Sequence, residues 1–339
     1  MVDVPFYRSE ETRGLATPSE YVTAVREGYR QRGEGAPAEP RTALTQTDPP
    51  GMLTGYLAVL PETGAMGGYT YAAGFGDEDA HFMLPLYDAA SGRPLAVFDG
   101  AHLNPFKTGA TGAVGVDALA RDDASTVGLF GSGTQARGQL RATATVRDLD
   151  QVNVYSPTAD HRETLAAEMN AELDATVAAV ASPAAAVESA DIVITATQSG
   201  EPVFDGDRLE PGTHVTAMGQ YHPDKREVDT QTVQQATYVP DLRARIEQDA
   251  GAFILAREEG SVDDDHVHAE LGDVVAGTAE GRTSDEEITL FDSGGTAIET
   301  VAAAHLLYEK AADRDLGESI SFAPASEAMD TAPAGEPTD

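Results

Sequence analysis

The chain of 339 residues contains no cysteine and no tryptophan. Without cysteine, disulfide bonds, thiolate metal sites and cysteine nucleophiles are all excluded. A metal site would have to rely on other ligands, and the most suggestive pair, His266 and His268, lies in a run of acidic residues. Because no third convincing ligand is evident, we expect a solvated acidic loop there and no bound metal.

Basic residues are scarce. The chain has 22 lysines and arginines against 57 aspartates and glutamates, which gives a net charge of −35, and three of the basic residues are lysines. Nucleic acid is an unsuitable partner because phosphate binding needs a clustered basic face. The excess of acids favours a halophilic source, since molar salt shortens the Debye length to about 3 Å and screens the self-repulsion.

Long apolar runs are also missing. No stretch is long enough to span a membrane. Residues 1–5 have neither the basic nor the apolar segment of a secretory signal. We therefore expect a cytoplasmic protein that has no membrane partner. Its length is sufficient for two domains with a sizeable core.

The first 100 residues have the pattern of a mostly antiparallel sheet with one leading helix. Apolar side chains at helical spacing predict a helix over 19–32. Strands are expected over 54–60, 70–75, 82–87 and 95–98. Residues 105–120 are rich in Ala, Gly and Val, which predicts a helix that packs tightly against a neighbour through its small residues.

From residue 126 onward, strands and helices alternate. Strands are expected over 126–130, 151–155, 192–196, 213–218 and 237–239, and helices over 134–145, 160–172, 184–189 and 230–235. Such alternation predicts βαβ units and a parallel sheet.

The first strand–helix junction of this half is a glycine turn, Gly131-Ser132-Gly133-Thr134-Gln135-Ala136. Gly131 permits the tight turn, Gly133 lets backbone N–H groups approach a phosphate, and Ala136 allows the helix to pack closely on the strand. The helix N-terminus adds unpaired donors and a partial positive charge. We therefore predict that this turn binds the pyrophosphate of a dinucleotide, which indicates a nicotinamide enzyme.

Together these patterns predict an α/β fold. A Rossmann doubly wound parallel sheet over residues 121–292 is inserted in a second, mostly antiparallel α+β domain. Residues 1–120 form the first part of that domain, and a helix over 295–308, within 293–319, returns to it. Residues 320–339 are dominated by Pro, Ala, Glu, Thr and Asp, which predicts a disordered acidic tail.

The end of the second strand bears on the choice of cofactor. An acidic residue there would hold the ribose of NAD, whereas an arginine nearby suits the 2′-phosphate of NADP. The strand ends without an acid, Ser156 and Thr158 can hydrogen-bond a phosphate, and Arg162 lies one turn into the next helix. We therefore favour NADP(H), with NAD(H) as the alternative. Farther along, Asp241, Arg243, Arg245, Glu247 and Asp249 have the pattern of surface charge on a helical stretch.

Through these residues and a series of short motifs, the chain resembles the ornithine cyclodeaminase/mu-crystallin family over roughly residues 21–310. The motifs are Pro40–Thr42, Tyr87–Ala89, Arg93–Ala96, Asp99–Gly100, Lys107–Ala110, Gly131–Ala136, Ala190–Thr197, Pro211–Val215, Lys225–Asp229, Ala269–Val274 and Ser293–Glu299. Each is weak alone, and their order is specific. The resemblance implies a homodimeric NAD(P) enzyme that transfers a hydride at the α-carbon of a small amino or imino acid, with the mostly antiparallel α+β domain serving catalysis and dimerisation.

The resemblance also implies roles for individual residues. Arg41 matches a family arginine that grips the substrate carboxylate, and Lys107 stands where a second such arginine is usual. Two tyrosines depart from the pattern: Tyr69 replaces a lysine and Tyr221 replaces a catalytic aspartate. His222 or Asp224 could supply the acid/base group beside that lost position. The cofactor contacts implied beyond the turn and the second strand are Thr197, Met218, Gly219, Ser293 and Gly294.

Three functions remain open from the sequence. The first is an NAD(P)-dependent amino-acid dehydrogenase or imine reductase. The second is a cyclodeaminase that converts ornithine to proline and ammonia with no net use of cofactor, and the missing aspartate weakens it. The third is a non-catalytic dinucleotide-binding protein, which the altered substrate residues keep open.

Overall fold

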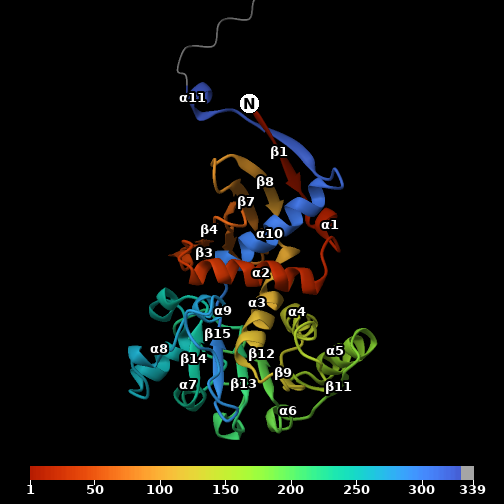
Figure 1. Cartoon of the computed structure of the whole chain (residues 1–339), viewed down its shortest axis with the longest axis vertical. Helices are drawn as coiled ribbons and strands as arrows, with labels where there is room; N and C mark the ends of the chain where they lie inside the picture. Colours follow the sequence, from red (N-terminus) through yellow and green to blue (C-terminus); the bar gives the residue numbers. More distant parts are fainter. Residues whose placement is uncertain (330–339) are drawn as a thin grey trace, which may run out of the picture.

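The computed structural model describes residues 1–329, which form two lobes stacked along the long axis (Figure 1). One lobe, with the N-terminus, contains a nine-stranded sheet, and the other contains a seven-stranded sheet. The fold is α/β as predicted, because the parallel sheet is built between two segments that both contribute to the other sheet. Within the described residues, no helix has the length and apolar character needed to cross a membrane.

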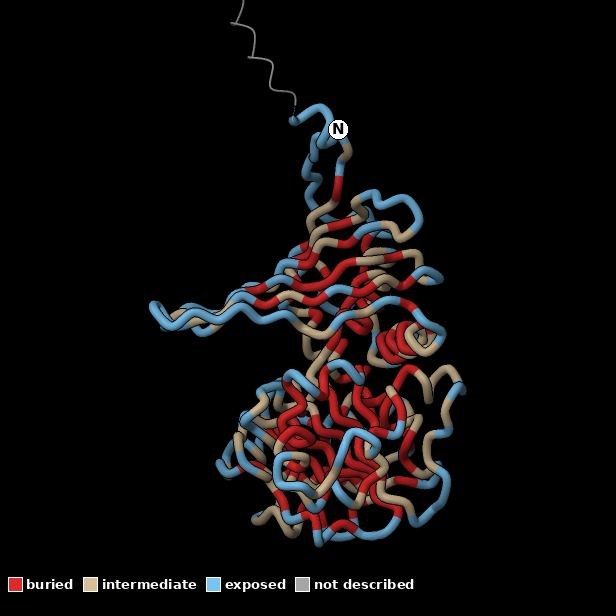
Figure 2. The backbone as a smooth tube through the Cα atoms, turned by 90° about the vertical axis from the view of Figure 1, so that its left-hand side faces the viewer, coloured by how far each residue is buried: buried red, intermediate tan, exposed pale blue. Residues whose placement is uncertain are grey.

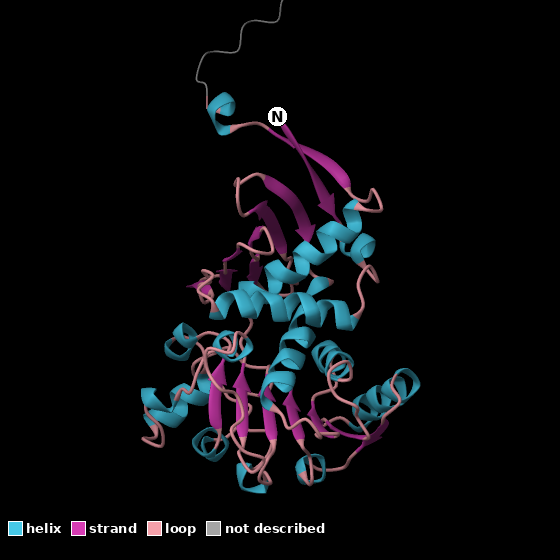
Figure 3. Cartoon of the chain, in the orientation of Figure 1, coloured by secondary structure: helices cyan, strands magenta, loops and turns pink. Residues whose placement is uncertain are grey.

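The nine-stranded sheet is mixed and mainly antiparallel. Its strands are β1 (Val2–Tyr7), β2 (Thr42–Thr47), β3 (Pro50–Gly55), β4 (Ala58–Leu60), β5 (Ala65–Gly67), β6 (Thr70–Ala73), β7 (Met83–Asp88), β8 (Pro94–Asp99) and β16 (Glu318–Phe322). The main path runs β16-β1-β8-β7-β6-β3-β2, in which β1 and β8 are parallel. Helices α1 (Ser9–Thr12), α2 (Pro18–Gly33) and α10 (Ala297–Ala312) belong to this lobe, and α2 and α10 cross the sheet (Figure 3).

Strands β2 and β3 extend from this lobe as an arm (Figure 2). Every residue of β2 is exposed, so the arm buries little of its own surface. Leu44 and Leu53 add large apolar side chains to that exposed surface. An exposed edge strand of this kind is a template for pairing with another chain.

The seven-stranded sheet is parallel throughout, in the order β11-β10-β9-β12-β13-β15-β14. Its strands are β9 (Thr126–Phe130), β10 (Gln151–Tyr155), β11 (Thr176–Ala179), β12 (Ile192–Thr195), β13 (His214–Ala217), β14 (Thr237–Pro240) and β15 (Thr289–Asp292). Its helices are α4 (Thr134–Thr143), α5 (Ala159–Glu172), α6 (Pro183–Val187), α7 (Thr230–Gln235), α8 (Gly251–Glu258) and α9 (Leu271–Val275). The strand order reverses between β9 and β12, which is where doubly wound sheets bind ligands.

Helix α3 (Leu103–Leu119) joins the two lobes and packs through small residues, as predicted. A Cβ built on Gly109 would lie 2.3 Å from the carbonyl oxygen of Gly138 in α4, so the two backbones are in direct contact. One on Gly115 would lie 2.5 Å from the ring of Phe291 in β15. The close packing of α3 against α4 and β15 therefore requires glycine at these two positions.

Several short strands were not predicted. Strands β5, β11 and β15 are too brief to show an alternating apolar pattern; β1 and β2 were also missed, although apolar side chains alternate in β1. The predicted tail was wrong in its first part, because residues 318–322 form β16, in which Val4 of β1 pairs with Ile320. Helix α11 (Ala325–Ala328) follows. The remainder of the predicted tail, residues 330–339, lies outside the described residues.

His214 in β13 gives the fold a dependence on pH. Its ring is fully buried between the hydroxyls of Thr289 and Thr216, each 2.9 Å from a ring nitrogen. Burial, reinforced by the charges of Arg282 and Arg147, lowers the pKa of His214 to about 3. Between about pH 6.5 and 3, His214 is protonated in the unfolded chain and neutral in the folded chain. The free energy of unfolding therefore falls as the pH falls.

We expect His214→Gln to remove this contribution. Urea unfolding of wild type and variant in constant KCl should give a difference in free energy that changes by at most about 1.4 kcal/mol per pH unit in that window. His161→Gln, at an exposed position in α5, is the matched control. Parallel pH profiles for wild type and His214→Gln would contradict the prediction.

Candidate functional site

The glycine turn follows β9 at the carboxyl end of the parallel sheet. Gly131 has φ of 115°, and a Cβ there would lie 2.4 Å from the carbonyl oxygen of Ala196, so glycine is required. Gly133 is the opposite case, because no heavy atom lies within 4 Å of its Cβ position. Helix α4 begins at Thr134 with Gly133 as its N-cap and no side chain capping its N–H groups. This open turn, with unpaired donors at its floor, fits a pyrophosphate.

The other residues of the turn occupy different surroundings. Ala136 is buried, where the helix meets the sheet, and Thr134 is exposed. Ser132 is half-buried, and its carbonyl accepts a hydrogen bond from Arg137 at 2.5 Å. Gln135 is half-buried and its side-chain oxygen has no hydrogen-bond partner. The turn is thus anchored by the buried Ala136, while the side-chain oxygen of Gln135 is left without a hydrogen-bond partner.

The end of β10 places its three predicted residues together. Ser156 is buried and its hydroxyl donates to the carbonyl of Thr158 at 3.3 Å. Arg162, one turn into α5, donates from Nη1 to the carbonyl of Ser156 at 2.8 Å. The guanidinium is therefore held at the carboxyl end of the strand next to β9.

A buried carboxylate that the sequence did not single out joins the ends of β12 and β13. Glu227 accepts hydrogen bonds from the backbone N–H of Thr197 and of Gly219, each at 2.6 Å, and from the hydroxyl of Thr195 at 3.0 Å. A Cβ on Gly219 would lie 2.5 Å from the carboxylate carbon, so glycine is required there. The half-buried Met218 donates its N–H to the carbonyl of Thr195 at 3.0 Å. Burial raises the pKa of Glu227, against the hydrogen bonds that favour its ionised form.

Three charged side chains meet around Gly295. Measured from its ideal Cβ position, Glu299 Oε1 lies at 3.5 Å, Lys107 Nζ at 3.7 Å and Arg41 Nη2 at 3.8 Å. Lys107 comes from α3 and Glu299 from α10, and the two form a buried ion pair of 3.1 Å. Arg41 comes from the segment before β2 and donates to the carbonyl of Gly294 at 2.5 Å. The structure thus brings Arg41 and Lys107 together, as expected.

Arg41 is the group with unused donors. Its side chain is 8% exposed, and its Nε and Nη1 are buried with no hydrogen-bond partner. The carboxylate of Asp249 lies 3.9 Å from Nη1, and the ring of Tyr221 lies over the guanidinium at 4.2 Å. Because a buried donor without a partner is costly, these nitrogens indicate the position of an anionic ligand.

The tyrosines and the predicted acid differ in their surroundings. Tyr69 is fully buried, its hydroxyl donates to the carbonyl of Gly100 at 2.8 Å, and its ring lies 5.7 Å from Lys107 Nζ. Burial raises the pKa of Tyr69 well above its usual value. Tyr221 is 44% exposed. Asp224 is 84% exposed, and its carboxylate lies 3.9 Å from the ring of His222, outside the group around Gly295.

The stretch 241–249 was predicted as surface charge, and this prediction was wrong for three of its residues. Asp241, Arg245 and Asp249 are buried. Arg245 forms ion pairs with Asp241 at 2.8 Å, with Asp249 at 2.6 Å and with Asp292 of β15 at 2.6 Å. We call these four residues the buried ionic cluster. Its burial follows from contacts with β15, which the local sequence does not show.

The cluster supports the loop that follows β15. One oxygen of Asp241 accepts hydrogen bonds from the hydroxyl of Ser293 at 2.8 Å and from the N–H groups of Gly294 and Gly295 at 3.0 and 3.1 Å. The same loop carries the carbonyl that receives Arg41. Through this loop, the buried ionic cluster helps to hold the Arg41 guanidinium in place at the carboxyl end of the parallel sheet. In the sequence, Asp241 stands in a run of alternating charges. Such a run is typical of an exposed helix, so the sequence contains no separate sign that Asp241 is buried.

Two other features lie apart from this site. The rings of His266 and His268 each bind a backbone carbonyl, of Val233 and of Glu280, both at 2.7 Å. Within the described residues no group of three or more potential ligands is arranged to hold a metal ion.

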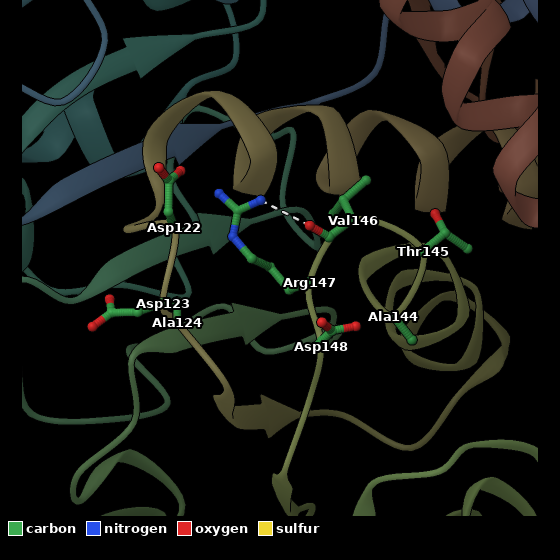
Figure 4. Close-up of a pocket in the computed structure, with 8 residues that line it drawn as sticks. All are labelled: Asp122, Asp123, Ala124, Ala144, Thr145, Val146, Arg147 and Asp148. Atoms are coloured by element: carbon green, nitrogen blue, oxygen red, sulfur yellow. Dashed lines mark hydrogen bonds between the residues drawn. The ribbon is translucent and has the colours of Figure 1, made fainter.

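A pocket of about 420 Å³ lies between loops 122–124 and 144–148 (Figure 4). These loops precede β9 and β10, so the pocket is at the amino end of the parallel strands, opposite the glycine turn. Its Arg147 donates to the carbonyl of Val146 at 2.8 Å and to carbonyls at the end of α3. Doubly wound sheets bind their cofactors at the carboxyl ends, so this pocket is not part of the site.

Comparison with known proteins agrees with the geometry. The sequence profile described as the ornithine cyclodeaminase/mu-crystallin family matches residues 6–315. An alanine dehydrogenase from Archaeoglobus fulgidus is 33% identical over 325 residues, which cover 92% of this chain and 97% of that protein.

Two solved structures extend the likeness to the fold. The Δ1-pyrroline-2-carboxylate reductase of Thermococcus litoralis, in complex with NADH and L-proline, superposes with a TM-score of 0.88 at 31% identity and covers 94% of this chain and 100% of that one. An archaeal alanine dehydrogenase dimer with bound NAD gives a TM-score of 0.88 at 30% identity and covers 95% and 100%. The chain belongs to the ornithine cyclodeaminase/mu-crystallin family.

Proposed function

We propose that this protein is an NAD(P)-dependent oxidoreductase that acts at the α-carbon of a small amino or imino acid. The observation that carries the proposal is Arg41, which meets Lys107 at the loop at the carboxyl end of the parallel sheet and has two buried nitrogens, Nε and Nη1, without a hydrogen-bond partner. The relatives described above act on alanine or on a cyclic imino acid with NAD or NADH. When bound, a nicotinamide supplies hydride transfer to or from the substrate carbon.

The side chains of this chain then divide the remaining work. Arg41 binds the substrate carboxylate through its unpartnered nitrogens, and the Gly294 carbonyl orients its guanidinium. Lys107 holds protons at Nζ, with its charge compensated by Glu299. Tyr221, which lies over Arg41, covers the carboxylate position and is the tyrosine whose hydroxyl can reach a substrate nitrogen, since the Tyr69 hydroxyl is engaged by Gly100. Positioning of this kind accounts for much of the rate of such reactions.

One substrate panel tests the function. The purified protein, kept in molar KCl because of its charge of −35, is mixed with reduced nucleotide and pyruvate plus ammonia, or with a cyclic imino acid, or separately with ornithine. Loss of reduced-nucleotide absorbance with an imine supports the proposal. Proline and ammonia from ornithine without net cofactor change would replace it with the cyclodeaminase reaction. Nucleotide binding with no turnover on any substrate would indicate a binding protein.

We further propose that the cofactor is NADP(H), with Arg162 as the group that meets the 2′-phosphate. The proposal is supported by the lack of an acid at the end of β10 and by the placement of Arg162 there. The solved relatives bind NAD or NADH, so the preference would distinguish this chain from them.

We expect Arg162→Ala to raise the Kd for NADPH about 10- to 100-fold and to leave the Kd for NADH nearly unchanged, because a charge-assisted hydrogen bond to a phosphate is lost. Calorimetric titration measures both constants. Arg141→Ala, on the helix before β10, removes a surface arginine paired with Glu172 and is the matched control. An unchanged NADPH preference in Arg162→Ala would remove Arg162 from the site, and tighter NADH binding by the wild type would overturn the preference itself.

We also propose that the chain forms a homodimer through the β2–β3 arm. The arm exposes Leu44 on the edge strand β2 and Leu53 on its neighbour β3, and the archaeal alanine dehydrogenase is a dimer. Sedimentation in molar KCl at twice the chain mass is the expected result, and sedimentation at the mass of one chain would contradict it.

A further inference from the structure

The buried Glu227 carboxylate has an unusual set of partners. Both of its oxygens accept short hydrogen bonds from backbone N–H groups, of Thr197 and of Gly219, and one also accepts the Thr195 hydroxyl. Within the described residues no lysine or arginine forms an ion pair with it. Two charged neighbours are paired elsewhere: Arg226 with Glu259 at 3.0 Å, and Asp292 with Arg245 at 2.6 Å.

This bonding pattern favours the ionised form. The carboxylate accepts from all three donors at once, whereas a proton on Oε1 would weaken the bond from Thr197 N–H and a proton on Oε2 would have to reverse the bond with the Thr195 hydroxyl. These donors oppose the burial that raises the pKa of Glu227, and none of them is a cation.

Its location gives that charge a role. Thr197 and Gly219 follow β12 and β13, which lie across the switch point from the strands that receive the adenosine half of a dinucleotide. The nicotinamide half therefore belongs beside Glu227. An oxidised nicotinamide ring is a cation and a reduced ring is neutral, so an unpaired carboxylate nearby favours the oxidised form.

We propose that Glu227 is a positioning residue that biases the site toward the oxidised nucleotide over the reduced one, while its hydrogen bonds hold the backbone of Thr197 and Gly219 in place. The inference rests on the proposed nicotinamide function and extends it to the redox state of the cofactor. The preference for the oxidised nucleotide would then come from Glu227 and not from the residues that bind the substrate.

Direct binding tests the inference without turnover. Calorimetric titration with NADP⁺, NADPH, NAD⁺ and NADH gives the ratio of Kd for the oxidised form to Kd for the reduced form. In Glu227→Gln, which keeps the shape and loses the charge, this ratio should rise roughly tenfold, because a unit negative charge on this side of the cofactor site is removed. Glu227→Asp keeps the charge and should hold the ratio within about threefold of wild type. Glu201→Gln, at an exposed position in the loop that follows β12, should change neither constant.

Each outcome is decisive. An unchanged ratio in a folded Glu227→Gln, with both affinities weakened equally, would reduce Glu227 to a structural hydrogen-bond acceptor and overturn the inference. Should that variant not fold, the wild type alone still decides, with ADP-ribose and its 2′-phosphate as baselines that lack the ring. The oxidised ring must then add more affinity than the reduced ring, and the reverse order overturns the inference. Failure of all four nucleotides to bind the wild type would instead refute the proposed function.

Discussion

Replacement of Arg41 by methionine should lower kcat/KM for the amino or imino acid by about 10²- to 10³-fold. The change removes the one buried cation in the site that has unpartnered nitrogens, and loss of one partner of a buried charge pair costs about 2–5 kcal/mol. Methionine retains most of the volume, so the ring of Tyr221 and the Gly294 loop keep an apolar neighbour. Steady-state kinetics in molar KCl measures the loss, most of which should appear in KM.

Two comparisons make this result specific. Arg41→Lys retains the charge without the planar guanidinium and should recover part of the lost activity. Arg208→Met removes an arginine that is 55% exposed on the parallel-sheet lobe and should leave kcat/KM unchanged. The Kd for the nucleotide should stay the same in all three variants, because Arg41 lies on the substrate side. A kcat/KM for Arg41→Met within a factor of three of wild type would remove Arg41 from carboxylate binding.

Replacement of Arg245 by methionine should have the largest effect on stability. The change leaves Asp241, Asp249 and Asp292 buried without the cation that pairs with all of them. Breaking a buried ionic network by removing one partner costs about 3–5 kcal/mol, because the remaining charges stay desolvated. Burial already raises the pKa of Asp292, and without Arg245 the main opposition to that shift is lost, leaving the hydrogen bond from the Tyr238 hydroxyl. Urea unfolding at constant KCl measures the free energy of unfolding.

Arg243→Met is the matched control, since Arg243 lies two residues away and is exposed. It should change the free energy of unfolding by no more than about 1 kcal/mol. Equal losses in the two variants would contradict a special contribution of the cluster. A residual effect on kcat/KM in a folded Arg245→Met would follow from the hydrogen bonds between Asp241 and the Gly294 loop.

Local pattern was enough to predict five of the seven strands of the parallel sheet, β9, β10, β12, β13 and β14. Strand β9 and the start of α4 agree with prediction to the residue, because an apolar run followed by a glycine turn is specified by neighbours in sequence. That Arg41 and Lys107 lie in one site was expected from the family resemblance, whereas their meeting point at Gly295 required the fold.

Other parts of the site depend on distant contacts that no local pattern reveals. Arg245 looks like a surface arginine in its own segment, and it is buried because Asp292 arrives from β15. Glu227 stands among charged residues, and its burial comes from the ends of β12 and β13. Strand β16 pairs with β1, more than 300 residues away in the sequence. The composition of its segment is that of a disordered tail and gives no sign of this pairing.

The contact between Gly109 and Gly138 has a consequence for an acidic protein in changing salt. Backbone touches backbone there, and the amide of Gln139 donates to the carbonyl of Thr108 at 2.8 Å alongside it. No ion pair belongs to this contact, so salt does not screen it directly. Ion pairs join the lobes elsewhere, as Arg32 does with Glu270 at 2.9 Å, so a rise in salt should weaken those contacts and leave the backbone contact of α3 with α4 beside Lys107 in place.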